Sequence, residues 1–159
     1  MRIRINELFV LLALMLPMLS VELKAQDYTI EEMSDEETTI PRPFSISRVL
    51  SFDRGLRIFL HTDDPDAIAN LIATGSLQAQ LSDHEAEIET AVALSLGKAV
   101  WCSDADDPVY LAFGDPLPAC DGNQPARIEY YLEMNAVLGP GLDLAIGQDP
   151  DFLWLIEER

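Results

Sequence analysis

The fold is decided by residues 57–80, RIFLHTDDPDAIANLIATGSLQAQ. An apolar run between a glycine and an Asp-Asp-Pro turn is typical of a strand, here expected over residues 55–61. Asp64 is a good helix N-cap, and Pro65 suits the first helical position. Apolar residues at helical spacing follow until Gly75, which is typical of a helix end. We therefore expect a strand followed directly by a helix.

Further elements follow towards the C-terminus. Residues 82–85, Ser-Asp-His-Glu, have the form of a capping box, so we expect a second helix that ends before Gly97. Residues 99–103 form a short apolar run suited to a buried strand. Residues 127–134, RIEYYLEM, alternate with period two, and residues 152–156 are expected as a final strand. Because helices and strands mix early and strands dominate late, we expect an α+β domain with small mixed sheets and two N-terminal helices.

The N-terminus has the features of a secretory signal peptide over residues 1–25. A basic start precedes an uncharged run at residues 8–21, and small Ala25 follows as a cleavage position. The run would rise only about 21 Å as a helix, against roughly 30 Å of hydrocarbon, so no stable membrane span is expected once the leader is removed. The alternative is an uncleaved anchor. Cleavage predicts a secreted or periplasmic protein.

Residues 26–43 are expected to form an acidic flexible linker. They carry six acidic residues and few large apolar groups, too little to offset the entropy cost of ordering. The globular domain is therefore expected over residues 44–159, a length sufficient for one core.

Cys102 and Cys120 are the two cysteines, and both lie beyond the leader. In an exported chain such a pair predicts a disulfide. The alternative is Cys102 as a nucleophile. Two histidines and two cysteines do not provide zinc-ligand spacing, so no metal site is expected.

The charge of the chain restricts its partners. Of the 10 basic and 28 acidic residues, three basic and two acidic ones lie in the leader, so the mature chain carries a net charge of −19. Such a surface repels nucleic-acid phosphates and anionic lipids. It attracts basic proteins, or it serves solubility alone.

Five segments between residues 57 and 157 resemble, in order and spacing, the motifs of the ADP-ribosyltransferase superfamily of the His-x-Thr type. They read IFLHT, DAIANLIATGSL, GKAVWCSDADDPVYLAF, ARIEYYLEM and DFLWLIEE. The resemblance implies NAD as cofactor, bound in a cleft between two small sheets.

The resemblance also implies roles for individual residues in NAD binding. His61 would hydrogen-bond the ribose, and Thr62 would assist through its hydroxyl or backbone. Trp101 or Tyr110 would stack on the flat nicotinamide ring.

A carboxylate would have to stabilise the oxocarbenium-like centre as nicotinamide leaves. Leu153 stands at the position where the family carries its glutamate, so the chain resembles a degenerate member. Asp151, Glu157 and Glu133 are the candidate replacements, and none of them is in register with the motif.

Two function classes follow. The first is transfer of ADP-ribose from NAD to a macromolecular target. The second is a non-enzymatic acidic periplasmic module that binds a basic protein, such as an immunity or inhibitor protein. A third alternative is an exported domain with a structural role and no ligand.

Overall fold

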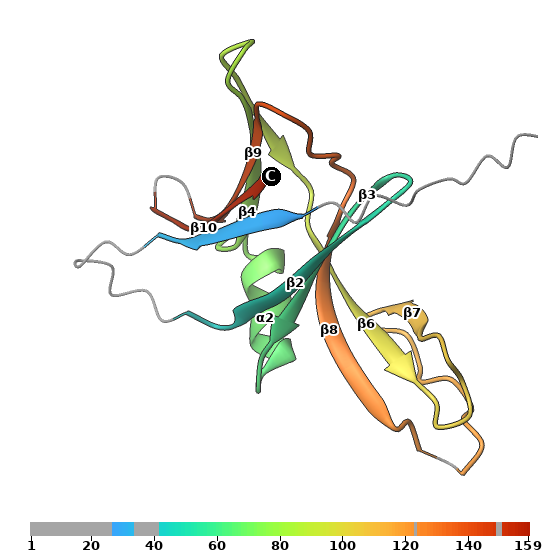
Figure 1. Cartoon of the computed structure of the whole chain (residues 1–159). Coiled ribbons are helices and arrows are strands. Elements are labelled where there is room, and N and C mark those ends of the chain that lie inside the picture. Colours follow the sequence, from blue (N-terminus) through green and yellow to red (C-terminus); the bar gives the residue numbers. More distant parts are fainter. Residues whose placement is uncertain (1–26, 34–41, 123, 149–150) are drawn as a thin grey trace, which may run out of the picture.

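The computed structural model describes residues 27–33, 42–122, 124–148 and 151–159, and the expected signal peptide lies outside them. This part of the chain forms two five-stranded sheets and a single α-helix (Figure 1). Every strand pairing is antiparallel. We name the sheets by their strand orders: sheet A is β1-β10-β9-β4-β5, and sheet B is β2-β3-β8-β6-β7.

The bounds of the elements are as follows. Sheet A consists of β1 (Tyr28–Glu32), β4 (Gln78–Asp83), β5 (Ile88–Val92), β9 (Leu142–Gln148) and β10 (Asp151–Glu158). Sheet B consists of β2 (Ser45–Phe52), β3 (Gly55–His61), β6 (Ser95–Trp101), β7 (Val109–Ala112) and β8 (Arg127–Met134). The helix is α2 (Pro65–Ala73).

Several expected elements are confirmed. β3 and β8 have the bounds that the sequence predicts. Helix α2 begins at Pro65, and the Asp64 side chain caps it by accepting a hydrogen bond from the Ala67 N–H at 3.0 Å. Gly75, two residues beyond the helix, has a φ of 73°, a left-handed conformation that favours glycine.

The expected α+β class with two N-terminal helices and mixed sheets is wrong. The segment expected as the second helix is a hairpin, in which β4 continues to Asp83 and β5 returns from Ile88. The Asp83 carboxylate accepts hydrogen bonds from the N–H groups of Glu85 and Ala86, each at 3.0 Å. It therefore closes a turn of the kind that aspartate favours, where the sequence pattern suggested a helix cap. Pairing of β4 with β9 on its other side fixes the extended conformation.

The segment expected as a flexible linker contributes to the fold. Its residues 28–32 form β1, which pairs with β10 from Tyr28–Glu158 to Glu32–Trp154. Residues 34–41 of that segment lie outside the described residues. The folded part of the chain therefore begins before Phe44.

A single core lies between the inner faces of the two sheets. Trp154 is fully buried in it, and the Phe44 ring stacks on the indole with centroids 4.3 Å apart. Ile68 of α2 adds to the same core. Beyond this core, β6, β7 and the start of β8 extend away from sheet A (Figure 1). The fully buried aliphatic side chains shared between the sheets include Leu56, Ile58, Leu132, Leu144, Ile146 and Ile156.

The outer face of sheet B alternates guanidinium groups with aromatic rings. The Arg48 guanidinium carbon lies 3.7 Å from the Phe59 ring centroid, and that of Arg57 lies 4.0 Å from the centroid of Tyr110. Such stacking contributes about 0.5–1 kcal/mol at exposed sites. Arg57 also donates to the Glu133 carboxylate at 2.7 Å. This face is therefore held together by its own side chains.

The expected disulfide is confirmed. Cys102 follows β6, and its sulfur is bonded to that of Cys120 in the loop between β7 and β8. Closing a loop of this length contributes about 3 kcal/mol in the chain-entropy model. In the described part of the chain, no helix is long and apolar enough to cross a membrane.

Gly97 lies against the Tyr131 ring, which leaves no room for a side chain at this position. A Cβ at this position would lie 2.3 Å from Cζ of Tyr131, whose hydroxyl donates to the Leu111 carbonyl at 3.3 Å. We expect Gly97→Ala to lower the free energy of unfolding by about 1–3 kcal/mol, measured by urea denaturation, because the ring must be displaced.

The control is Gly114→Ala, where no atom lies within 4 Å of the added carbon. This variant should keep the stability of the parent protein. Equal stability of the two alanine variants would contradict close packing at Gly97.

Candidate functional site

The outer face of sheet A carries a polar row that crosses all five strands. The register pairs place its members side by side: Glu157 of β10 opposes Asp143 of β9, and Asp143 opposes Ser82 of β4. Glu89 of β5 and Thr29 of β1 complete the row at its two ends. Directly opposed residues of antiparallel strands point to the same face, so three carboxylates share one line. We call these five residues the acidic row.

The acidic row is fixed by the core on the other face of the sheet. Ile156 and Leu144 are fully buried neighbours of Glu157 and Asp143 along their strands. Because successive strand residues point to opposite faces, burying these apolar groups directs both carboxylates outward.

His84 approaches the row from the turn after β4. Its backbone N–H donates to the Gly141 carbonyl at 3.1 Å, and its Nε2 contacts a carboxylate oxygen of Asp143. The His84 side chain is 62% exposed and that of Asp143 only 12% exposed, so the ring covers the carboxylate from the solvent side. The hydrogen bond and the charge of Asp143 raise the pKa of His84 above its ordinary value.

The Asp143 carboxylate repels the carboxylate of Glu157 on the neighbouring strand. The charge of Asp143 raises the pKa of Glu157 above its ordinary value, with smaller contributions from burial, from hydrogen bonding to Asp143 and from Glu31. Like charges opposed across strands are destabilising. The row therefore carries more negative charge than its own partners neutralise.

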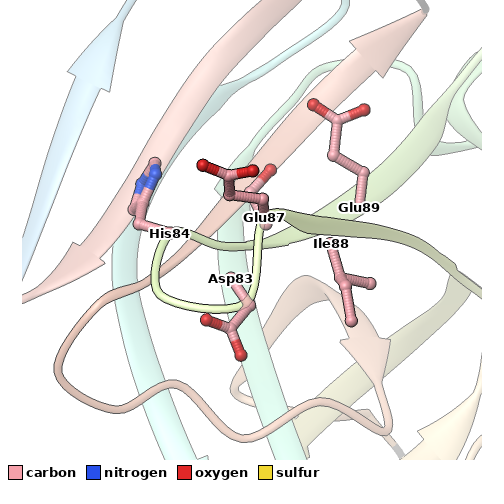
Figure 2. A pocket seen from close by; sticks show the side chains of 6 residues that line it. Asp83, His84, Glu87, Ile88 and Glu89 are labelled. Atoms are coloured by element: carbon pink, nitrogen blue, oxygen red, sulfur yellow. The ribbon is translucent and has the colours of Figure 1, made fainter.

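A hollow of about 530 Å³ opens beside this row at the β4–β5 turn. Figure 2 shows Glu87 and Glu89 projecting to one side of the hairpin and Ile88 to the other. Glu87 has a φ of 54°, which sets it in the left-handed conformation at the end of the turn. The residues that line this hollow are Ser82, Asp83, His84, Glu87, Ile88 and Glu89.

The arrangement is suited to holding positive charge. Glu89 is exposed and Glu157 is half-buried, whereas His84 covers Asp143. Glu157 and Asp143 lie on neighbouring strands, about 4.8 Å apart, and Ser82 of β4 separates Asp143 from Glu89. The Nε2 atom of His84 is engaged with Asp143. No group of three or more metal-ligating side chains is gathered in the described part of the chain.

The residues expected to bind NAD lie on sheet B. His61 ends β3, and strand alternation puts it on the same outer face as Phe59. Trp101 packs against the cluster of Phe59, Ala99 and Tyr131 on this face, and Tyr110 of β7 makes an edge contact with the Tyr131 ring. Three strand spacings separate β3 from β7, on the order of 14 Å, so His61 and Tyr110 are not neighbours.

Several features of this face do not fit NAD. The Thr62 hydroxyl is engaged within the chain, donating to the Pro43 carbonyl at 3.2 Å and accepting from the Asp64 N–H at 3.1 Å. Arg127 covers the Trp101 ring at 4.0 Å. The hollow beside Tyr110 measures about 210 Å³, below the roughly 300–1,000 Å³ of typical ligand pockets, and neither His61 nor Trp101 lines it.

The expected catalytic carboxylates are not brought to the same place. Glu157 faces outward from sheet A, whereas His61, Trp101 and Tyr110 lie on the outer face of sheet B, across the core. Asp151 is the first residue of β10, and its side chain lies outside the described part. Glu133 lies on the outer face of sheet B, where its carboxylate is hydrogen-bonded to Arg57. Glu157 therefore does not form one site with the residues expected to bind NAD.

Asp143 and the role of His84 are not found by sequence reasoning. The sequence places His84 in the first turn of a helix, as a solvated surface group. Asp143 lies in the segment LDLAIG, where one acid interrupts an apolar run at strand spacing. That interruption is the available signal of an outward-facing position, but no local pattern pairs it with His84.

No family model, no curated protein and no solved structure matches this chain significantly.

Asp143 links the two raised pKa values, so removing its charge should lower both. We expect Asp143→Asn to bring the pKa of His84 and the pKa of Glu157 down towards their ordinary values, measured by NMR titration. Asp104→Asn, an exposed charge change in the loop after β6, is the control and should leave both unchanged. Unchanged titration of His84 in Asp143→Asn would contradict the pairing.

The same variant has a consequence for stability. Because the folded-state pKa of His84 is raised, its pairing contributes stability below the unfolded value of about 6.5, and this is lost as the pH rises through the raised pKa. Repulsion at Glu157 also costs stability as its proton leaves with rising pH. The parent protein should therefore lose more thermal stability than Asp143→Asn as the pH rises.

Proposed function

We propose that this protein is a non-enzymatic acidic module that binds a basic protein through the outer face of sheet A. The observation that carries the proposal is the opposition of Glu157 and Asp143, whose mutual repulsion raises the pKa of Glu157. His84 covers Asp143, so Glu157 is the member of the pair that a partner can reach. A lysine or arginine placed beside Glu157 would offset the repulsion from Asp143, and binding of that cation would therefore be favourable.

The hollow at the β4–β5 turn supports the same partner. Ile88 is 56% exposed there, next to Glu87 and Glu89. Glu87 and Glu89 project to one side of the hairpin, where they can hold the charged head of a lysine or arginine, while Ile88 lies on the other side. The hollow can therefore receive one basic side chain of the partner.

The net charge supports the proposal on a larger scale. A chain with a formal net charge of −18 attracts basic molecules from a distance and speeds their association. The disulfide between Cys102 and Cys120 supports placing this module in an oxidising compartment, secreted or periplasmic.

The test is a charge-matched pair of triple variants, titrated with an octa-lysine peptide at low salt. Changing Glu87, Glu89 and Glu157 to glutamine should weaken binding about tenfold, since three surface ion pairs at about 0.5 kcal/mol each are lost. Changing the exposed Asp104, Asp106 and Asp107 to asparagine removes the same charge from the loop after β6 and should leave affinity within about twofold.

Two results would overturn the proposal. One is equal weakening by both triple variants, which would mean that net charge alone attracts the peptide. The other is binding that does not fall as salt is raised, because exposed ion pairs are screened.

ADP-ribosyl transfer from NAD is a second proposal, which rests on the motif resemblance of residues 57–157. His61, Trp101 and Tyr110 share the outer face of sheet B, but His61 and Tyr110 are not neighbours on it. This proposal predicts heat on titration with millimolar NAD by calorimetry, and loss of that heat in His61→Ala. His84→Ala, on the other sheet, is the matched control and should bind as the parent does. Absence of heat from the parent protein would end this proposal.

A further inference from the structure

In the described part of the chain, β5 is an edge strand that is paired on one side. It pairs with β4 alone, and among the described elements its extensive contacts are with that strand only. Its first four residues, Ile88–Ala91, are exposed. In an antiparallel edge strand, alternate residues direct their N–H and C=O groups away from the sheet. β5 therefore presents backbone donors and acceptors to solvent.

The edges of sheet B carry features that protect them from further pairing. β2 is interrupted by a register shift between Ile46 and Arg48. β7 has only four residues, and it lies within the loop closed by the Cys102–Cys120 disulfide. Bulges and short length are devices that block strand addition.

β5 has neither device. Its register with β4 is unbroken from Asp83–Ile88 to Ala79–Val92, and its sequence, IETAV, contains no proline or lysine. The remaining edge, β1, adjoins segments outside the described residues, so it does not allow the same comparison.

The two faces of β5 differ in chemistry. Glu89 continues the acidic row on the outer face, and Ile88 and Val92 point to the opposite side (Figure 2 shows Glu89 and Ile88 diverging). A strand added alongside would place alternate side chains next to Glu89 on one face and next to Ile88 on the other. Basic residues fit the first position and apolar residues the second.

We propose that the basic partner binds β5 as an extended segment of alternating basic and apolar residues, which becomes the sixth strand of sheet A. This inference rests on the proposed function and adds the mode of binding. Main-chain hydrogen bonds supply affinity in this mode, and alternate side chains supply specificity. A second copy of this chain is a poor occupant, because two molecules of such negative charge repel each other.

The experiment uses the full chain and two synthetic peptides of equal composition. One alternates lysine and valine, and the other carries its lysines and valines in separate blocks. We expect the alternating peptide to bind about tenfold more tightly, and to slow hydrogen exchange of the outward β5 amides at least about tenfold, because those groups become bonded.

Proline substitution separates the backbone from the charge. Of Thr90→Pro and Ala91→Pro, one removes an outward N–H and the other an N–H bonded to β4, since adjacent residues alternate. Thermal unfolding identifies the variant that keeps its stability. That variant, with all carboxylates intact, should lose the preference for the alternating peptide.

Each outcome has a distinct meaning. Failure of both peptides to bind would overturn the proposed function itself. Equal binding of both peptides, with unchanged β5 exchange and no effect of the tolerated proline, would leave that function standing and overturn strand addition. Self-association that strengthens as salt is raised would identify β5 as a contact between copies and overturn the basic occupant.

Discussion

The stacking of Phe44 on Trp154 fixes the relation between the two sheets. Trp154 lies on β10 within sheet A, and Phe44 immediately precedes β2 of sheet B. Both rings are buried in the shared core. The indole N–H has no protein acceptor among the described residues, an arrangement that costs about 1–3 kcal/mol. Burial of the large apolar indole in the centre of the core offsets this cost.

The same tryptophan determines where the acidic row lies. A register irregularity between Phe152 and Trp154 keeps the indole directed inward, and Glu157, three residues later, then points outward. A slip of one residue would exchange the faces and bury the carboxylate. The surface chemistry of sheet A is thus a consequence of how its core packs.

Local patterns account for part of this fold. RIEYYLEM alternates strictly, and Asp64-Pro65 marks a helix start, so β8 and α2 could be predicted. The stretch after Ser82 fits both the helical period and the strand period, because Ile88 and Val92 would share one face of a helix and also one face of a strand. β4 pairs with β9, more than fifty residues away, and β5 pairs with β4 on its other side. These pairings make the stretch a strand.

The site is harder to predict than the elements for the same reason. His84 and Asp143 meet only because β4 and β9 are neighbours in sheet A, and neither residue carries a local sign of the other. The two outer faces also divide the charges of the chain. The outer face of sheet A gathers carboxylates, whereas the outer face of sheet B holds three of the seven basic residues beyond the leader, each stacked on a ring: Arg48, Arg57 and Arg127.

The pairing of β1 with β10 has a consequence for how the protein reaches its native state. Strand partners from Tyr28–Glu158 onward are separated by most of the chain, and β10 lies between β1 and β9 in sheet A. A long loop must close, at a cost in entropy, before these contacts can stabilise the chain. Contacts of such sequence separation therefore slow folding. Sheet A can be completed only after residues 28–158 have all emerged from the ribosome. Until then sheet A lacks β10, the strand that joins β1 to β9, whereas every strand of sheet B lies within residues 45–134.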